Sequence, residues 1–447
     1  MTNASPHYVS RRSILVAALS TIVEWYDFTL YLYFSAVLSR VFFGDSAQAM
    51  MLTLSVFAVT YLLRPVGAIF FARIGDRYGR RRMLLLSMAM MTGAMLLTAL
   101  LPTWHQAGSV ASVSIMLLRA LMTFSVGGEY NGVVAYLLEG TPPQHRGQMA
   151  SLASAASEVG ALLAVGISAL TVSLLSEASL EAWGWRIPFV VGFVLAGSLW
   201  AARSALEESP DFELHRRPGI PLSLRTTLSR YRLAIGRSFA VSALGSVTYY
   251  IGITYVPTYL VSMGICSDKD ALVLSTVAAL CVVLITPVVG YLSDRVGRKP
   301  VLACCALVAV ALPVILFPLM AGGAYAESLV GAVLLACLAG SVSAVGASAT
   351  AEQFPVEGRL TGLALGTTAA TAIFGGLAPW IAQRVITSTG NPIVPGLIIA
   401  LVALAVLPVF LRMPETAPKK ERRIAWSPGL PAVVVSSPVR QQGLRQA

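Results

Sequence analysis

Long apolar runs follow one another along almost the whole chain, separated by short polar segments. A helix needs about 20 apolar residues to cross the hydrocarbon core of a bilayer. Membrane strands would give alternating segments of about ten residues, which this chain does not show. The pattern therefore predicts an all-α membrane protein with twelve transmembrane helices. The predicted spans are 13–39, 47–72, 83–101, 109–138, 148–176, 184–206, 235–262, 271–293, 301–321, 328–351, 360–384 and 393–412.

A long arginine-rich segment near the middle of the chain divides the spans into two sets of six. The tail that follows the last span contains several prolines and no heptad pattern, so we expect it to be disordered. The predicted organisation is a cytoplasmic N-terminus (1–12), an N-terminal six-helix bundle (13–206), a cytoplasmic linker (207–234), a C-terminal six-helix bundle (235–412) and a disordered cytoplasmic tail (413–447).

The two sets of spans carry matching landmarks. The second and eighth spans are followed by Asp76-Arg77-Tyr78-Gly79-Arg80 and Asp294-Arg295-Val296-Gly297-Arg298. Glu139 and Glu352 end the fourth and tenth spans, and Glu208-Ser209-Pro210 and Pro414-Glu415-Thr416 follow the sixth and twelfth. Repeats of this kind are typical of transporters built from two related halves. The sequence predicts two pseudo-symmetric six-helix bundles.

The repeated loops combine residues that suit a contact between helix ends. Gly79 permits backbone conformations closed to other residues, and Asp76 can lie against the N-terminus of a neighbouring helix. The arginines can reach Glu139 and Glu352. One interpretation is a cytoplasmic gate of ion pairs that form and break as the halves move; the other is a signal that only fixes topology. The predicted gate residues are Asp76, Arg77, Gly79, Arg80, Glu139, Asp294, Arg295, Gly297, Arg298 and Glu352.

Composition supports the membrane assignment. Hydrophobic residues make up 56% of the chain and charged residues 12%, against about 25% charged in soluble domains. The formal net charge is +11, and the positive-inside rule explains it better than nucleic-acid binding does. The segments 73–82, 203–237 and 294–299 are strongly basic while the alternate loops are not. We expect both termini in the cytoplasm.

Other chemistry finds little support in the sequence. The five cysteines form no CxxC pair, so neither a disulfide nor a metal site is expected. No phosphate-binding loop of the ATP-driven pumps is present, and no nucleophile, histidine and acid combine into a catalytic set. We expect no enzyme activity and no cofactor; the coupling ion expected for the transport function described below is the proton.

Six ionisable side chains lie within predicted spans, all in the first half, and such residues are costly enough to indicate function. They are Glu24, Asp27, Arg64, Arg119, Glu129 and Glu158. Glu24 and Asp27 share one helix face, and two neighbouring buried carboxylates bind a proton more readily than an isolated one. The alternative is a static ion-pair network that holds the helices together. The second half offers aromatic residues and few charges at mid-depth.

Further motifs sharpen the assignment. They are Glu24-Trp25-Tyr26-Asp27-Phe28, Arg64-Pro65-Val66-Gly67, Val126-Gly127-Gly128-Glu129-Tyr130, Gly184-Trp185-Arg186-Ile187-Pro188-Phe189, Glu208-Ser209-Pro210-Asp211-Phe212 and Ala351-Glu352-Gln353-Phe354-Pro355. With the repeated loops, the chain resembles the major facilitator superfamily, and within it the metabolite:proton symporters that carry proline and betaine, citrate, 2-oxoglutarate or shikimate. This family often has glutamine where Glu158 stands.

The resemblance implies the major facilitator fold and a multi-pass protein of the bacterial inner membrane. It also implies a pair between Asp27 and Arg119. We expect proton coupling by Asp27, Glu24, Arg119 and Glu129. We expect substrate binding by Trp25, Tyr26, Tyr31, Arg64, Glu158, Tyr249, Tyr250 and Tyr255, although the span-one aromatics could equally be core packing.

The predicted function is proton-coupled symport of a small polar metabolite by a monomer in the lipid bilayer. Free arginines at 64 and 119 would favour a carboxylate; if acids neutralise both, a zwitterion such as proline or betaine fits better. A proton-driven exporter is the alternative, although its usual Gly-Pro pair in span five is missing here. A transporter-like nutrient sensor is less favoured, because the loop and tail are short for a signalling domain.

Overall fold

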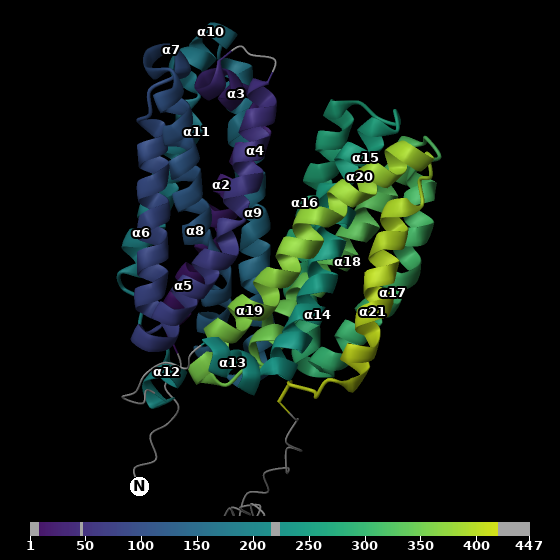
Figure 1. Cartoon of the computed structure of the whole chain (residues 1–447). Coiled ribbons are helices and arrows are strands. Elements are labelled where there is room, and N and C mark those ends of the chain that lie inside the picture. Colours follow the sequence, from purple (N-terminus) through teal and green to yellow (C-terminus); the bar gives the residue numbers. More distant parts are fainter. Residues whose placement is uncertain (1–8, 45–47, 216–223, 419–447) are drawn as a thin grey trace, which may run out of the picture. The chain divides into compact units, whose positions relative to one another are not determined.

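The computed structural model describes residues 9–44, 48–215 and 224–418, and all regular structure in these ranges is helical. Figure 1 shows the helices of the first half, α1 to α11, grouped on one side and those of the second half, α14 to α21, on the other. The N-terminal bundle contains α1 (Arg11–Leu19), α2 (Thr21–Tyr33), α3 (Ser35–Phe43), α4 (Ala49–Tyr61), α5 (Leu63–Tyr78), α6 (Arg80–Ala99), α7 (Trp104–Ala107), α8 (Ser109–Glu139), η1 (Pro143–His145), α9 (Arg146–Leu174), α10 (Glu177–Ser179), η2 (Leu180–Gly184) and α11 (Arg186–Arg203).

Two short helices, α12 (Pro210–His215) and α13 (Leu224–Arg230), lie in the segment predicted as a linker. The second half then contains α14 (Arg232–Tyr249), η3 (Tyr250–Thr254), α15 (Val256–Ser262), α16 (Asp268–Val296), α17 (Arg298–Met320), α18 (Tyr325–Ala351), η4 (Val356–Gly358), α19 (Arg359–Thr371), η5 (Ala372–Leu377), α20 (Ala378–Thr389) and α21 (Val394–Arg412). Of the predicted tail, residues 419–447 lie outside the described residues, as do residues 1–8 of the predicted N-terminus.

The predicted spans are found in order. Ten helices or continuous helical runs among the described residues are long and apolar enough to cross a membrane. An eleventh span is α14 with η3 and α15, bent by 42°. The remaining prediction, 47–72, corresponds to α4 and α5, which meet at Leu62; α4 has only 13 residues, and α5 carries Arg64, Arg73, Asp76 and Arg77. With 13 and 16 residues, α4 and α5 are each too short to cross a membrane alone.

Several spans are interrupted where the sequence predicts continuous helices. The first is divided into α1, α2 and α3, with breaks at Ser20 and Phe34. The Ser20 hydroxyl donates to the Ala17 carbonyl at 2.5 Å, a local bond that competes with the helix ladder. In the second half, the π-helical segments η3 and η5 interrupt the seventh and eleventh spans.

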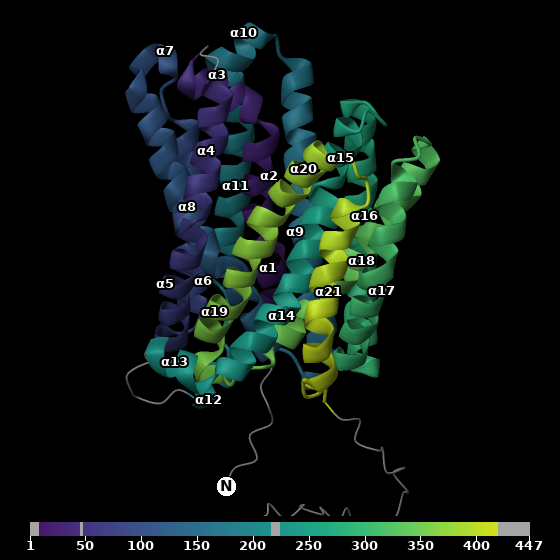
Figure 2. The same cartoon turned by 45° about the vertical axis from the view of Figure 1, so that its right-hand side comes forward.

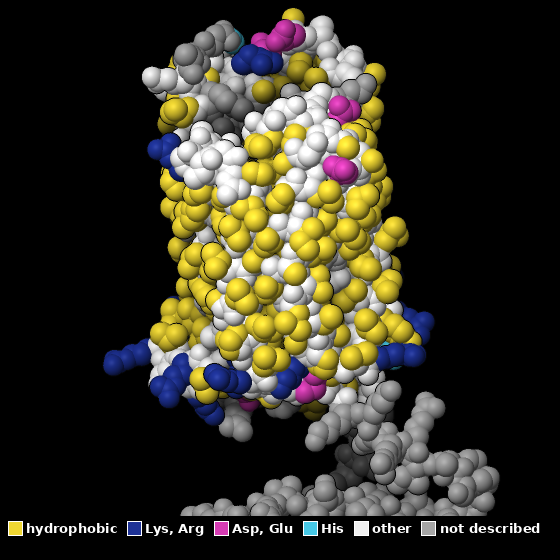
Figure 3. Space-filling model, turned by 90° about the vertical axis from the view of Figure 1, so that its right-hand side faces the viewer, with side chains coloured by type: hydrophobic (Ala, Val, Ile, Leu, Met, Phe, Trp, Pro, Cys, Tyr) yellow, Lys and Arg dark blue, Asp and Glu magenta, His cyan; other side chains and the backbone are white. Residues whose placement is uncertain are grey.

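The surface agrees with a membrane setting. Figure 3 shows hydrophobic side chains over the middle of one face and lysines and arginines gathered toward one end. We call this the basic end; it is where α5 meets α6 and α16 meets α17. Figure 2 shows α12 and α13 at the same end. The apolar middle is what a lipid-facing belt requires, because a charged side chain at the bilayer centre is costly.

Each half has its own apolar core, and a third core joins the halves near the basic end. This shared core packs Phe71, Met83 and Leu138 of the first half with Phe354 and Leu360 of the second. Close backbone packing adds to it. A Cβ atom on Gly147 of α9 would lie 2.7 Å from the carbonyl oxygen of Gly290 in α16 and 2.6 Å from the Ser293 hydroxyl. The halves therefore meet with no space for a side chain at this seam.

Candidate functional site

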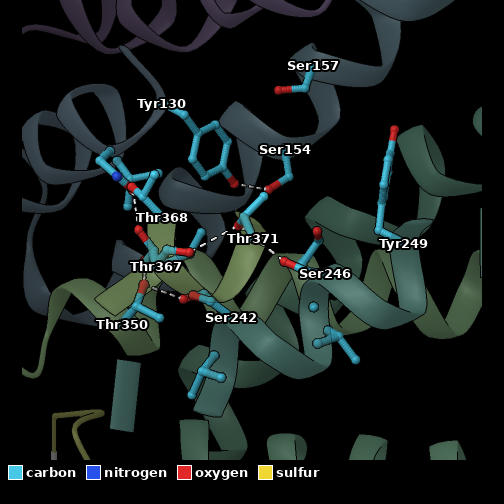
Figure 4. Close-up of a pocket in the computed structure, with 18 of the residues that line it drawn as sticks. Tyr130, Ser154, Ser157, Ser242, Ser246, Tyr249, Thr350, Thr367, Thr368 and Thr371 are labelled. Atoms are coloured by element: carbon cyan, nitrogen blue, oxygen red, sulfur yellow. Dashed lines mark hydrogen bonds between the residues drawn. The ribbon is translucent and has the colours of Figure 1, made fainter. Parts of the chain in front are cut away.

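A cavity of about 1060 Å³, including its space open to solvent, lies between the two halves. Helices α2, α5, α8 and α9 line it from the first half, and α14, α18 and α19 line it from the second. Figure 4 shows hydroxyl-bearing side chains from both halves pointing into it. Five of the eight residues predicted for substrate binding line this cavity, namely Trp25, Arg64, Glu158, Tyr249 and Tyr250.

The first half supplies the charged part of the cavity wall. Arg64 and Glu158 are the only charged residues among the described side chains that line it. Glu158 is 4% exposed and interacts with the hydroxyl of Tyr249 from the second half. The Tyr249 ring also meets Trp25 edge to face, with ring centroids 5.3 Å apart. One tyrosine thus contacts two first-half residues across the cavity.

The second half supplies an uncharged, hydroxyl-rich wall. Its polar lining residues include Ser242, Ser246, Ser343, Thr350, Thr367, Thr368 and Thr371. The Ser246 hydroxyl donates to that of Thr371 at 3.2 Å (Figure 4). Thr367 donates to the Asn131 side chain of the first half, also at 3.2 Å. These hydroxyls were missing from the predicted site, although Ser242 and Ser246, like Thr367 and Thr371, are four residues apart and so share a helix face.

Two first-half residues outside the prediction also line the cavity through hydroxyl groups. Tyr130 of α8 and Ser154 of α9 have their oxygens 2.7 Å apart (Figure 4). Tyr130 follows Glu129 in a predicted motif, but a tyrosine inside an apolar helix gives no sign of the direction in which it points.

Two carboxylate–arginine pairs lie at or behind this wall. Arg119 donates to Asp27 at 2.6 Å, which confirms the predicted contact. Arg64 donates to Glu24, which is 1% exposed. Oε2 of Glu24 and Nε of Arg119 are buried with no hydrogen-bond partner among the described residues. Both arginines are therefore paired with acids, which is the case that favours a zwitterion over a carboxylate.

Glu129 lies in a third pair, away from the cavity lining. It accepts hydrogen bonds from Arg203 and from Ser87, the latter at 2.5 Å. Sequence analysis counted Arg203 with the basic loop, and this was wrong: Arg203 is the fully buried last residue of α11. Its position next to the linker explains the error, because the arginines that follow it belong to the linker.

Three tyrosines predicted for substrate binding do not line the cavity. The hydroxyl of Tyr26 donates to the Pro188 carbonyl at 2.7 Å, and that of Tyr31 to the Thr53 carbonyl at 3.2 Å. Tyr255 donates to Gln383 at 2.6 Å. Tyr26 follows Trp25 directly and so projects from a different face of the helix. The structure places these side chains in helix packing.

The predicted cytoplasmic gate residues meet at the basic end. Asp76 accepts hydrogen bonds from the backbone N–H and hydroxyl groups of Thr361, at 3.0 and 2.7 Å, where α19 begins. Asp294 accepts from the backbone N–H groups of Gly147 and Gln148, both at 2.8 Å, where α9 begins. The expectation that Asp76 lies against a helix N-terminus is confirmed. Each aspartate contacts the opposite half.

The arginines of the two loops also find the predicted partners. Arg80 donates to both oxygens of Glu139, at 2.9 and 3.0 Å, and Glu139 also accepts from Arg359 of the second half at 2.7 Å. Arg298 donates to Glu352 at 3.2 Å. Gly79 and Gly297 have φ values of 107° and 117°, a region that favours glycine.

Arg77 and Arg295 differ from the other predicted gate residues. Both are exposed, and their guanidinium groups lie over the rings of Tyr78 and Tyr291, at 5.0 and 4.5 Å from the ring centroids. The structure does not bring them into the ion-pair contacts of the basic end. Spacing alone could not separate them from Arg80 and Arg298, which stand three residues further along.

Comparison with known proteins agrees with this architecture. The family model described as "Sugar (and other) transporter" matches residues 13–218, and that of the Major Facilitator Superfamily matches residues 267–444. The proline/betaine transporter of Escherichia coli K12 is 32% identical over 425 residues, covering 91% of this chain and 84% of the relative. The alpha-ketoglutarate permease of the same strain is 33% identical, with coverages of 83% and 86%.

Solved structures share the fold at lower identity. The proton:xylose symporter XylE aligns with a TM-score of 0.73 and 18% identity over 91% of this chain and 96% of its own. The human organic anion transporter MFSD10 aligns with a TM-score of 0.67 and 16% identity, over 90% and 99%. The likeness in fold, with the sequence match to the bacterial transporters, shows that this chain belongs to the major facilitator superfamily, in the metabolite:proton symporter family.

Proposed function

We propose that this protein is a symporter that couples entry of a small polar organic metabolite to entry of a proton by alternating access. The observation that carries the proposal is a pair of buried carboxylate–arginine contacts at and behind the wall of a cavity between two halves. Buried ion pairs are costly to form in the membrane and mark proton or ion pathways. In this proposal the basic end faces the cytoplasm, with both termini inside, in a bacterial inner membrane.

Asp27 and Glu24 are the proposed proton sites. Each is paired with one arginine, and a proton taken up by either carboxylate removes the charge that holds its arginine in place. The released arginine then changes the charge of the cavity wall, because Arg64 belongs to that wall. Glu129 is joined to Arg203 away from the lining, so Asp27, Arg119 and Glu24 carry the proposal.

The basic end is the proposed cytoplasmic gate. Asp76, Asp294 and Arg359 each bond across the halves at that end, so they must separate before the cavity can open there. Relatives of this chain are a proline/betaine transporter, an alpha-ketoglutarate permease and the citrate-proton symporter of Klebsiella pneumoniae. Their range of substrates supports a small organic metabolite and does not choose among them.

The test is uptake in proteoliposomes with an imposed pH gradient, using proline, glycine betaine, citrate and 2-oxoglutarate. We expect wild-type protein to accumulate at least one of them when the outside is acidic. Asp27→Asn should lose gradient-driven accumulation while it still exchanges substrate across the membrane, because exchange needs no net proton release. Glu213→Gln, on the exposed face of α12, is the matched control and should behave as wild type.

Three results would contradict this proposal. Accumulation by Asp27→Asn at the wild-type level would remove Asp27 from the coupling step. Uptake driven only when the inside is acidic would indicate proton-driven export. Transport that ignores the pH gradient would exclude proton coupling altogether.

A further inference from the structure

The buried ionisable residues at and around the cavity wall include four carboxylates and three arginines. Arg64 and Arg119 are paired with Glu24 and Asp27, and Arg203 is paired with Glu129. The other carboxylates described in the first-half helices, Asp76, Glu139, Glu177 and Glu181, also form ion pairs with arginines. Glu158 is the exception among the described residues, and it lines the cavity.

The surroundings of Glu158 do not neutralise it. Its neighbour from the second half is the phenol of Tyr249, which is a neutral group and cannot balance a carboxylate charge. A buried carboxylate in this position is unfavourable unless a cation or a proton joins it.

Hydrogen-bond donors line the same cavity as Glu158 and Tyr249. Nε1 of Trp25 is buried and has no acceptor among the described residues, although the indole lines the cavity. Its ring meets that of Tyr249 at 5.3 Å between centroids. A buried N–H without an acceptor is unfavourable, so a bound oxygen atom at this point would satisfy it. Arg64 lines the cavity as a second donor.

We propose that Glu158 binds the cationic group of the substrate, so that the cavity takes a small zwitterion with its carboxylate toward Trp25 and Arg64. This rests on the proposed transport function and names its substrate class. An amino acid or betaine has both charges within a few bonds of each other, which suits a cavity where Glu158 and the Trp25 indole both neighbour Tyr249. A di- or tricarboxylate would bring further carboxylates to a wall whose Glu158 already lacks an arginine partner.

The test is equilibrium binding to the purified full-length protein by titration calorimetry, with pairs of probes that share a shape. Glycine betaine is compared with 3,3-dimethylbutyrate, in which carbon replaces the charged nitrogen. L-proline is compared with cyclopentanecarboxylate in the same way. We expect at least one zwitterion to bind wild-type protein on the order of 30-fold or more tightly than its uncharged-carbon partner, the usual range for losing one member of a buried charge pair.

Glu158→Gln keeps the shape of the side chain and removes its charge. In this variant the difference between zwitterion and carbon analogue should fall to within about threefold, because no charge remains to distinguish the two. Trp25→Phe should weaken both members of a pair alike, since the carboxylate is common to them. Glu213→Gln is the control and should leave all affinities unchanged.

The proposal is overturned if neither zwitterion binds, if wild-type protein binds a carbon analogue as tightly as its zwitterion, or if Glu158→Gln retains the full difference. The first two results come from wild-type protein, so they hold even if the variant fails to fold. Binding is measured without a gradient. A zwitterion that binds as expected but is not accumulated with protons would therefore contradict the transport proposal and leave this one standing.

Discussion

The two copies of the Asp-Arg loop at the basic end make the same backbone contacts and different ion pairs. In both, the aspartate caps the first turn of a helix in the opposite half, α19 for Asp76 and α9 for Asp294. A glutamate from beyond the last span of each half caps the next helix: Glu208 accepts from the Arg80 N–H and Glu415 from the Arg298 N–H, each at 2.8 Å. The two halves thus make matching contacts wherever a carboxylate accepts from backbone N–H groups.

The side-chain pairs are unequal. Glu139 receives Arg80 and Arg359, an ion pair that crosses the halves. Arg146 begins α9 as Arg359 begins α19, but it lies 3.5 Å from Asp211 of α12 and forms no described ion pair with Glu352. Glu352 accepts from Arg298 and the Thr416 hydroxyl, as Glu139 accepts from Arg80 and the Ser209 hydroxyl, but no described arginine of the opposite half joins it.

The cause lies in the segment appended to each half. The first half continues into α12, which brings Asp211 to Arg146, whereas none of the described residues that follow α21 forms an ion pair with Arg359. The helix caps are the same in both halves because almost every residue supplies a backbone N–H group. The ion pairs differ because they depend on the side chains in the segment that follows each half. The closed basic end is therefore held tightly on one side and more loosely on the other.

The largest expected difference is between Glu139→Gln and Glu352→Gln. The first change leaves buried Arg359 without a carboxylate and Arg80 with Asp76 alone, at 3.3 Å, which should destabilise the protein by about 3–5 kcal/mol. In the second, Arg298 keeps Asp294 at 2.7 Å, so we expect a loss of about 1–2 kcal/mol. Thermal unfolding of both variants in one detergent measures this. Equal loss would show that the two copies are energetically alike.

A smaller difference should separate Arg359→Gln from Arg146→Gln. Arg359 gives Glu139 a buried, charged hydrogen bond, and its removal should cost about 1.5–3 kcal/mol. The pair of Arg146 with Asp211 is partly exposed, with side chains 22% and 28% accessible, so its loss should stay below about 1 kcal/mol. The same unfolding measurement applies. A larger effect at Arg146 would mean that it pairs with Glu352 in another state of the transporter.

The smallest difference is expected between Asp76→Asn and Asp294→Asn, because both caps use the same geometry. Each change removes a charge from a helix N-terminus, an interaction worth about 0.3–1 kcal/mol. The arginine four residues on, Arg80 or Arg298, loses one partner in each case and keeps its glutamate. Both variants should insert normally. Their substrate exchange in proteoliposomes should be slower by about two- to fivefold, the factor that corresponds to this change in free energy. If both variants exchange substrate at the wild-type rate, the loops only fix topology. If only one variant is slower, the two caps are not equivalent.

Much of this arrangement follows from the sequence. Apolar length places the spans, and Asp76, Gly79 and Glu139 have contacts or backbone angles that their residue types predict. Partner choice does not follow, since spacing cannot tell that Arg203 turns inward to Glu129 while Arg77 stays exposed. The hydroxyl wall was also missed, because serine and threonine in membrane helices usually bond to their own backbone, and only the tertiary arrangement shows which of them face a cavity.

The glycine seam between α9 and α16 has a consequence for ligand affinity. In the transport cycle proposed above, the basic end opens and closes, so a methyl group on Gly147 or Gly290 would raise the free energy of the closed state described here. Each 1.4 kcal/mol of added strain would shift the ratio of closed to open molecules about tenfold. By linkage, a ligand that prefers the closed state would bind more weakly by up to the same factor. A methyl group on Gly147 would thus change the affinity for a ligand bound at Glu158, about 16 Å away along α9, without contacting that ligand.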